Sequence, residues 1–234
     1  MDPVHDIFLV IRDLVANFLL GYLPSWAVDW IMAILGIALF LAFATGTVMM
    51  LVWMERRIGG FIQARLGPNR VGPFGLLQMV ADTIKLLTKE SIIPARGDKV
   101  MYYAAPAVAV AASLMTYAVI PFGRGMSYAD LNIGILYIIS ISSLGVLGVL
   151  MAGWGSNNKY ALLGAMRGAA QMISYEIPIV LSILGVVMIT GSLSMSAIVN
   201  AQSGWLWNII VQPLGFLVYF IAAIAEVNRQ PFDL

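Results

Sequence analysis

Long apolar stretches with very few charges make up most of the chain. They lie near residues 27–54, 100–123, 131–155, 168–190 and 206–226. A helix needs about 20 consecutive, mainly apolar residues to cross the hydrocarbon core of a bilayer, and each stretch is long enough. A polar segment, residues 191–204, separates the last two stretches. The pattern therefore predicts five transmembrane helices.

Two further segments have the periodicity of amphipathic helices. Near residues 6–22, apolar side chains recur at helical spacing from Ile7 to Tyr22. Near residues 74–90, polar side chains recur at steps of four, three and four residues, at Gln78, Asp82, Lys85 and Lys89. Periodicity alone favours a solvated face here over a ligand-lining role. We predict two helices at the membrane surface, and with the five spans an all-α, polytopic transmembrane helix bundle that forms one membrane domain over residues 1–234.

The composition supports a membrane protein. Of the 234 residues, 61% are hydrophobic and 11% are charged, and the mean hydropathy is +0.90. Soluble domains carry about 25% charged residues. The difference excludes an ordinary water-soluble fold.

The sequence lacks the residues that common cofactors require. It has no cysteine and a single histidine, His5, so it cannot supply the thiolates of an iron–sulfur cluster or two histidines for a haem. It contains no P-loop, and no Gly-x-Gly-x-x-Gly motif follows a strand pattern, so the sequence does not support nucleotide binding by this chain. The formal net charge of +1 indicates no nucleic acid partner. We therefore expect no metal site and no catalytic redox centre in this chain.

Lysine and arginine residues are concentrated on one side of the predicted spans. That side carries Arg56, Arg57, Arg65, Arg70, Lys85, Lys89, Arg96, Lys99, Lys159, Arg167 and Arg229. Of the 13 lysines and arginines, only Arg12 and Arg124 lie on the other side. Positive residues accumulate in cytoplasmic loops, so the side rich in lysine and arginine is predicted to face the cytoplasm. An odd number of spans places the two termini on opposite faces, which predicts an external N-terminus and a cytoplasmic C-terminus.

A segment rich in glycine and proline follows the first span. Its residues favour tight turns and predict a rigid loop at the membrane surface: Gly67, Pro68, Asn69, Arg70, Gly72 and Pro73. Arg56 and Arg65 precede these turns. Membrane topology alone explains such a cluster of arginines, so the charges by themselves do not indicate a binding site.

Two carboxyl side chains fall within predicted spans. Glu176 lies inside the fourth span, and Glu226 lies at the inner end of the fifth. An ionisable residue within a span costs about 2.5–3.5 kcal/mol or more, so it needs a partner or a function. A buried hydrogen bond would hold helices together, whereas proton transfer would use the exchangeable proton. We favour proton transfer for Glu176, beside which Pro178 removes a backbone hydrogen bond, and leave both explanations open for Glu226.

Several motifs, in order along the whole chain, resemble the H-subunit family of NADH-quinone oxidoreductase, respiratory complex I. They are Glu55-Arg56-Arg57, the run from Arg65 to Gln78, Ala81-Asp82, Lys85-Leu86, Lys89-Glu90, the run from Lys159 to Arg167, Ser174-Tyr175-Glu176, and the run from Glu226 to Asp233. Members of that family are longer and continue beyond the position of Leu234. We therefore expect the chain to be incomplete at its C-terminus.

The resemblance implies a function for particular residues. It places Arg56, Arg65, Asp82 and Lys85 at a quinone chamber, and Glu176, Glu226 and the neighbouring hydroxyl of Tyr175 on a proton path. Quinone is then the substrate of the complex. NADH, flavin and iron–sulfur clusters belong to partners among the peripheral-arm and other membrane subunits. The expected location is a bacterial plasma membrane.

Other functions remain open at this point. Membrane-bound hydrogenases and related dehydrogenases share the same membrane module. A stand-alone proton-coupled transporter would also explain Glu176, but it predicts an internal repeat that the sequence does not show. A purely structural anchor would tolerate glutamine at position 176.

Overall fold

A computed structural model describes residues 3–123, 127–202 and 204–232. Every regular element within these ranges is a helix, so the prediction of an all-α fold is confirmed. The chain divides into two compact units, Met1–Ser91 and Ile92–Leu234, which are described separately. The extent of the membrane domain, residues 1–234, stays a prediction.

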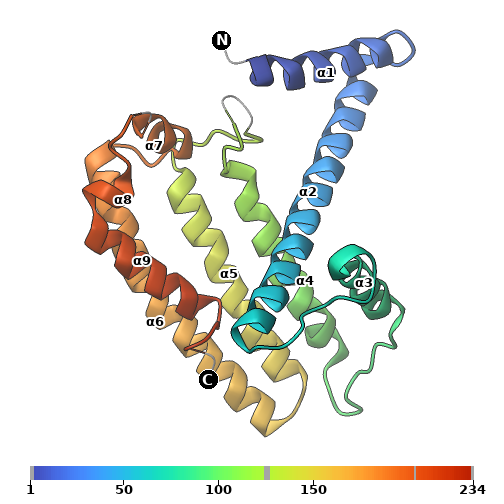
Figure 1. Cartoon of the computed structure of the whole chain (residues 1–234), viewed down its shortest axis with the longest axis vertical. Coiled ribbons are helices and arrows are strands. Elements are labelled where there is room, and N and C mark those ends of the chain that lie inside the picture. Colours follow the sequence, from blue (N-terminus) through green and yellow to red (C-terminus); the bar gives the residue numbers. More distant parts are fainter. Residues whose placement is uncertain (1–2, 124–126, 203, 233–234) are drawn as a thin grey trace. The chain divides into compact units, whose positions relative to one another are not determined.

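The first unit contains two long helices and a short one (Figure 1). Helix α1 (Pro3–Leu20) corresponds to the predicted amphipathic segment, and α2 (Ser25–Ile62) follows after a short turn. A 3-10 turn, η1 (Pro73–Gly75), leads into α3 (Gln78–Thr88), which packs against α2. Helix α3 is therefore the second amphipathic segment, shorter by a few residues at each end.

The second unit is a layered helix bundle (Figure 1). Helix α5 (Gly134–Gly155) packs against α4 (Lys99–Thr116) and α6 (Lys159–Thr190), and α9 (Pro213–Glu226) packs against α6. The remaining elements are short: η2 (Tyr117–Val119), α7 (Met195–Ala201) and α8 (Asn208–Val211). Asp98 and Asn158 accept backbone N–H groups at the starts of α4 and α6, as N-cap residues do.

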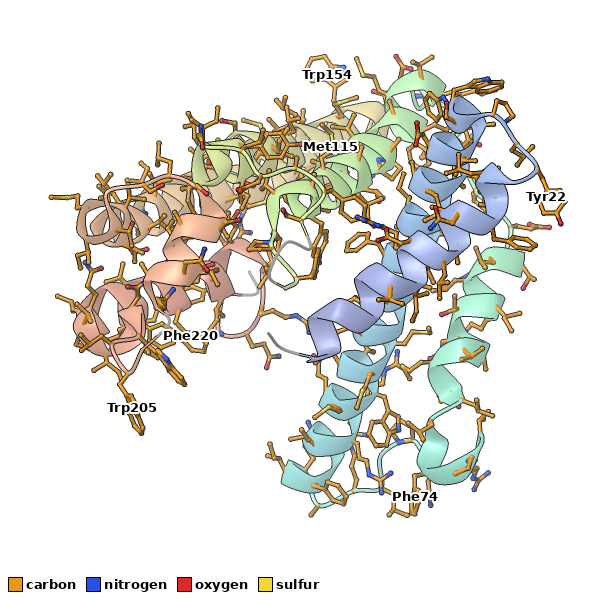
Figure 2. The ribbon with its side chains drawn as sticks, turned by 90° about the horizontal axis from the view of Figure 1, so that it is seen from above. Tyr22, Phe74, Met115, Trp154, Trp205 and Phe220 are labelled. Carbon is orange, nitrogen blue, oxygen red and sulfur yellow. The ribbon has the colours of Figure 1, made fainter. Side chains whose placement is uncertain are left out.

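Four helices are long and apolar enough to cross a membrane among the residues described. They are α2, α4 with its η2 extension, α5 and α6. Their large apolar side chains point outward, as lipid-facing side chains do; Trp154 of α5 is 70% exposed. Trp205, in the segment between α7 and α8, is 94% exposed, and Figure 2 shows both tryptophans pointing away from the ribbon. Tryptophan is enriched where a membrane meets water.

The contacts between helices are made by small residues. Ala105, Ala112, Ala169, Ala222 and Ala225 are each at most 4% exposed. An added Cβ on Gly153 of α5 would lie 2.3 Å from Ala165 Cβ of α6, so these backbones approach closely. Small residues at helix contacts with large residues facing outward are typical of membrane helix bundles.

Three of the predicted spans differ from the helices in the structure. Helix α6 begins at Lys159, before the predicted start at residue 168. Helix α2 has 38 residues, which corresponds to about 57 Å at 1.5 Å per residue, against about 30 Å for the hydrocarbon core. Its helical backbone continues through Arg56 to Ile62, beyond the predicted end of the first span near residue 54, because no proline interrupts the segment. The predicted fifth span is divided before Pro213, since a residue preceding proline disfavours helical geometry. Helix α9 has 14 residues, so the fifth crossing stays a prediction.

Candidate functional site

The loop between α2 and α3 lies against the last turns of α2. The Gly60 carbonyl accepts the Arg65 N–H at 2.9 Å, and a Cβ on Gly60 would lie 3.0 Å from the Gly67 nitrogen. Gly72 has φ 73°, a left-handed conformation that favours glycine. A Cβ on Gly75 would lie 2.3 Å from the Pro68 carbonyl oxygen. These contacts explain the glycines of the predicted tight loop.

Arg57 attaches this loop to α2. Its guanidinium carbon lies 5.3, 5.7 and 5.2 Å from the ring centroids of Trp53, Phe61 and Phe74. Arg57 and the Trp53 indole donate to the Phe74 carbonyl oxygen at 3.0 and 3.1 Å. Phe74 has φ 55°, a conformation that costs about 1–3 kcal/mol for a residue other than glycine. The cation–π contacts and hydrogen bonds offset that cost and fix the entry to α3.

Asp82 on α3 pairs with Arg56 on α2. The Arg56 Nη1 donates to Asp82 Oδ2 at 2.7 Å, and the Gln78 amide donates to Oδ1 at 3.1 Å. The hydrogen bond from Arg56, then that from Gln78, lowers the pKa of Asp82 below its ordinary value of 3.8, and the charge of Lys85 acts in the same direction. Because folding lowers this pKa, the pair stabilises the fold above that value and weakens as the pH falls through the lowered pKa. The carboxylate is charged at neutral pH.

Arg65 lies apart from this pair. Its Nε donates to Gln63 Oε1 at 2.6 Å, and among the described residues no hydrogen bond or ion pair joins it to Asp82. The structure therefore brings Arg56, Asp82 and Lys85 into one electrostatic environment and leaves Arg65 on the adjoining loop. Arg65 is exposed, with Asn69 and Arg70 further along the loop.

Glu176 lies on α6 facing α5 and α9. The Ser143 hydroxyl of α5 donates to Glu176 Oε1. The carboxyl groups of Glu176 and Glu226 interact electrostatically, and both side chains are half-buried. Three helices of the second unit therefore bring a hydroxyl and two carboxyl groups together within the predicted spans.

Tyr175 lines an open groove rather than the carboxyl cluster. Its ring lies 5.3 Å from that of Phe232, centroid to centroid, at a groove of about 850 Å³ between α5, α6 and residues 228–232. Gln171 holds that last segment, because its Nε2 lies 2.8 Å from the Ala225 carbonyl oxygen and 3.1 Å from that of Phe232. Successive helical side chains diverge, so Tyr175 and Glu176 have different surroundings although the resemblance places both on a proton path.

Three contributors to these sites were not predicted from the sequence: Arg57, Ser143 and Gln171. The adjacent serines 142 and 143 were the available signal for the second, since polar residues inside an apolar span need a partner. Nothing in the local pattern distinguished Arg57 from the other arginines of its side.

Comparison with known proteins identifies the family of the chain. The sequence model of the NADH dehydrogenase family matches residues 35–234. The chain belongs to the NADH dehydrogenase family. Its relatives include the H subunit of NADH-quinone oxidoreductase from Dehalococcoides mccartyi (strain CBDB1), 57% identical over 205 residues, which are 88% of this chain and 58% of the relative. The predicted resemblance to the H-subunit family is confirmed.

Relatives from other bacteria have the same name. The H subunit of Brevibacillus brevis (strain 47) is 51% identical over 93% of this chain and 64% of its own length. That of Geobacillus sp. (strain WCH70) is 52% identical over 92% of this chain and 65% of its own length. The chain thus spans 58–65% of the length of these curated relatives.

Proposed function

We propose that this chain is a membrane subunit of a proton-translocating NADH-quinone oxidoreductase. The family match, together with relatives that are named as the H subunit of such an enzyme, supports a subunit of a complex over a stand-alone transporter. Its partners in this proposal are peripheral-arm and other membrane subunits, which bind NADH, flavin and iron–sulfur clusters. The sequence itself has no cysteine to ligate a cluster. The chain lies in a bacterial plasma membrane in this proposal, with its N-terminus outside and its C-terminus in the cytoplasm.

The first proposed role is the polar end of a quinone chamber. The pair of Arg56 with Asp82 is the observation that carries it, because it fixes a guanidinium beside a membrane-surface helix. Asp82 uses one of the five guanidinium N–H groups, so others are left to donate to a quinone carbonyl oxygen. Exposed apolar side chains of α3, such as Ile84 and Leu87 at 56% and 81% exposure, suit an isoprenoid tail.

The second proposed role is proton transfer by the carboxyl groups of the other unit. Glu176 and Glu226 interact with each other, and a hydroxyl on α5 donates to Glu176. Carboxyl groups inside a membrane span are retained at a cost, and proton relays are a common reason. Tyr175 supplies a further hydroxyl at the adjacent groove.

The quinone role is tested with Asp82→Asn in the assembled complex. Loss of the charge should free Arg56 from its fixed position and lower quinone reductase activity about tenfold, the factor expected for one charge-assisted hydrogen bond. Electron transfer to a soluble artificial acceptor should be unchanged. Arg65→Ala should give a smaller loss, because its side chain bonds Gln63 instead.

Asp13→Asn is the matched control, since Asp13 accepts from Arg12 at the same 2.7 Å on exposed α1. It should leave both assays unchanged. Equal loss of both activities in Asp82→Asn, or loss of neither, would show that the pair serves assembly or topology rather than quinone access.

A further inference from the structure

The Ser143 hydroxyl lies between two acceptors. It is 3.1 Å from the Ile139 carbonyl oxygen, one turn earlier in α5, and it also bonds Glu176 Oε1 on α6. A hydroxyl group has one proton to donate and two lone pairs that accept. Ser143 therefore cannot donate to both oxygens at once.

The protonation state of Glu176 decides which acceptor the hydroxyl uses. An ionised carboxylate only accepts, so the Ser143 proton must point to it. A protonated carboxyl group can donate to the Ser143 oxygen, and the serine proton then turns to the Ile139 carbonyl. Both states leave Glu176 hydrogen-bonded, which matters because leaving a desolvated polar group without a partner is unfavourable.

We propose that Ser143 is a positioning residue whose hydroxyl reorients between Ile139 and Glu176 as the carboxyl group gains and loses its proton. This inference rests on the proposed proton-transfer role of Glu176. It adds a hydroxyl group that keeps the Glu176 carboxyl hydrogen-bonded in both its ionised and its protonated state. A rotating hydroxyl needs no movement of the helices, so the carboxyl group stays in place through each cycle.

The surroundings of Glu176 leave few other groups for this role. Helices α5, α7 and α9 pack against α6, and their described sequences carry one charged residue, Glu226. Tyr175 faces Phe232. Within the described residues, Ser143 is the hydroxyl that bonds the Glu176 carboxyl.

Ser142 provides a matched control on the same helix. Its side chain is also half-buried, and its hydroxyl donates to the same Ile139 carbonyl at 2.9 Å. Among the described residues it bonds no carboxyl group. Removing its hydroxyl takes one hydrogen bond from the Ile139 carbonyl and leaves the bond between Ser143 and Glu176 in place.

The test compares Ser143→Ala, Ser142→Ala and Glu176→Gln in the assembled complex reconstituted into liposomes. Proton translocation should fall about tenfold in Ser143→Ala, the factor expected for one hydrogen bond to a charged group, and stay near the parental rate in Ser142→Ala. Infrared difference spectra taken on quinone reduction report the same event. The C=O band of the protonated carboxyl group that disappears in Glu176→Gln should shift in Ser143→Ala and not in Ser142→Ala.

The outcomes separate the two proposals. Equal translocation and an unshifted band in the two serine variants would overturn the role of Ser143, while a defect in Glu176→Gln would keep the proton-transfer role. Parental translocation in Glu176→Gln would overturn both.

Discussion

At the scale of single residues, the carboxyl groups fall into two kinds of environment. Asp82 has a guanidinium, an amide and an ammonium charge around it, which keep it ionised. Glu176 lies inside a predicted span, where its partner is the uncharged hydroxyl of Ser143 rather than a guanidinium. The first arrangement suits a fixed charge at a binding site, and the second is compatible with proton exchange.

Replacement of Glu176 by glutamine tests this difference. Glu176→Gln keeps the shape of the side chain and its hydrogen-bonding capacity but removes the exchangeable acid. The assembled complex should lose most of its quinone-linked turnover or proton translocation, because a relay requires that proton. Glu226→Gln should have a milder effect, since Glu226 lies at the end of α9.

Normal assembly, quinone reduction and pumping in Glu176→Gln would make this residue a packing contact between α5 and α6. The amount of complex in the membrane is the control for both variants.

The residues of these sites were predictable to different degrees. Glu176 stood out because a carboxyl group inside a span has few explanations. Asp82 was assigned by the family resemblance, since the periodicity of its segment alone favoured a solvated face. Their partners did not stand out. The Ser143 contact depends on which face of α5 meets α6, and the Phe74 contact of Arg57 depends on the left-handed turn at Phe74. Helical spacing does not define either.

At the scale of helices, two glycines of α5 have opposite surroundings. A Cβ on Gly153 would lie 2.3 Å from Ala165 Cβ and 3.2 Å from the Ala161 carbonyl oxygen, whereas a Cβ on Gly145 would meet nothing within 4 Å. Both obstacles at Gly153 are attached directly to the α6 backbone. The two helices must therefore separate to admit a methyl group there.

Gly153→Ala should lower the unfolding free energy by about 1–3 kcal/mol, the usual cost of overpacking. The measurement is denaturant unfolding of the purified chain in detergent, followed by circular dichroism. Gly145→Ala should be neutral or slightly stabilising, because alanine is the better helix former. Equal effects of the two changes would show that α5 and α6 do not pack as described.

Helix positions were more predictable than helix ends. The apolar stretches located α4, α5 and α6 because length and composition alone define a membrane span. They could not show that α2 and α6 extend beyond the apolar stretch, since charged residues are good helix formers outside the lipid. Hydropathy could not predict the break before Pro213, because it scores side chains and the break comes from the backbone restriction that proline imposes.

At the scale of the whole molecule, the distribution of positive charge is the basis for the proposed orientation. Single cysteines test it directly, because the sequence has none. In intact cells, an impermeant thiol reagent should label Ser127→Cys and not Ser156→Cys, since the lysine- and arginine-rich side faces the cytoplasm. Both variants should be labelled after permeabilisation, and the reverse pattern in intact cells would invert the proposed orientation.

The alanines and glycines between the helices of the second unit have a thermodynamic consequence. Alanine and glycine have no side-chain rotamers to lose, whereas a buried leucine or isoleucine loses about 0.5–1 kcal/mol of conformational entropy. Helix association in lipid has no hydrophobic driving force to offset such losses. Contacts at Ala105, Ala169 and Ala225 therefore let weak dispersion forces hold α4, α5, α6 and α9 together, while the outward-facing leucines and isoleucines keep their freedom in the lipid.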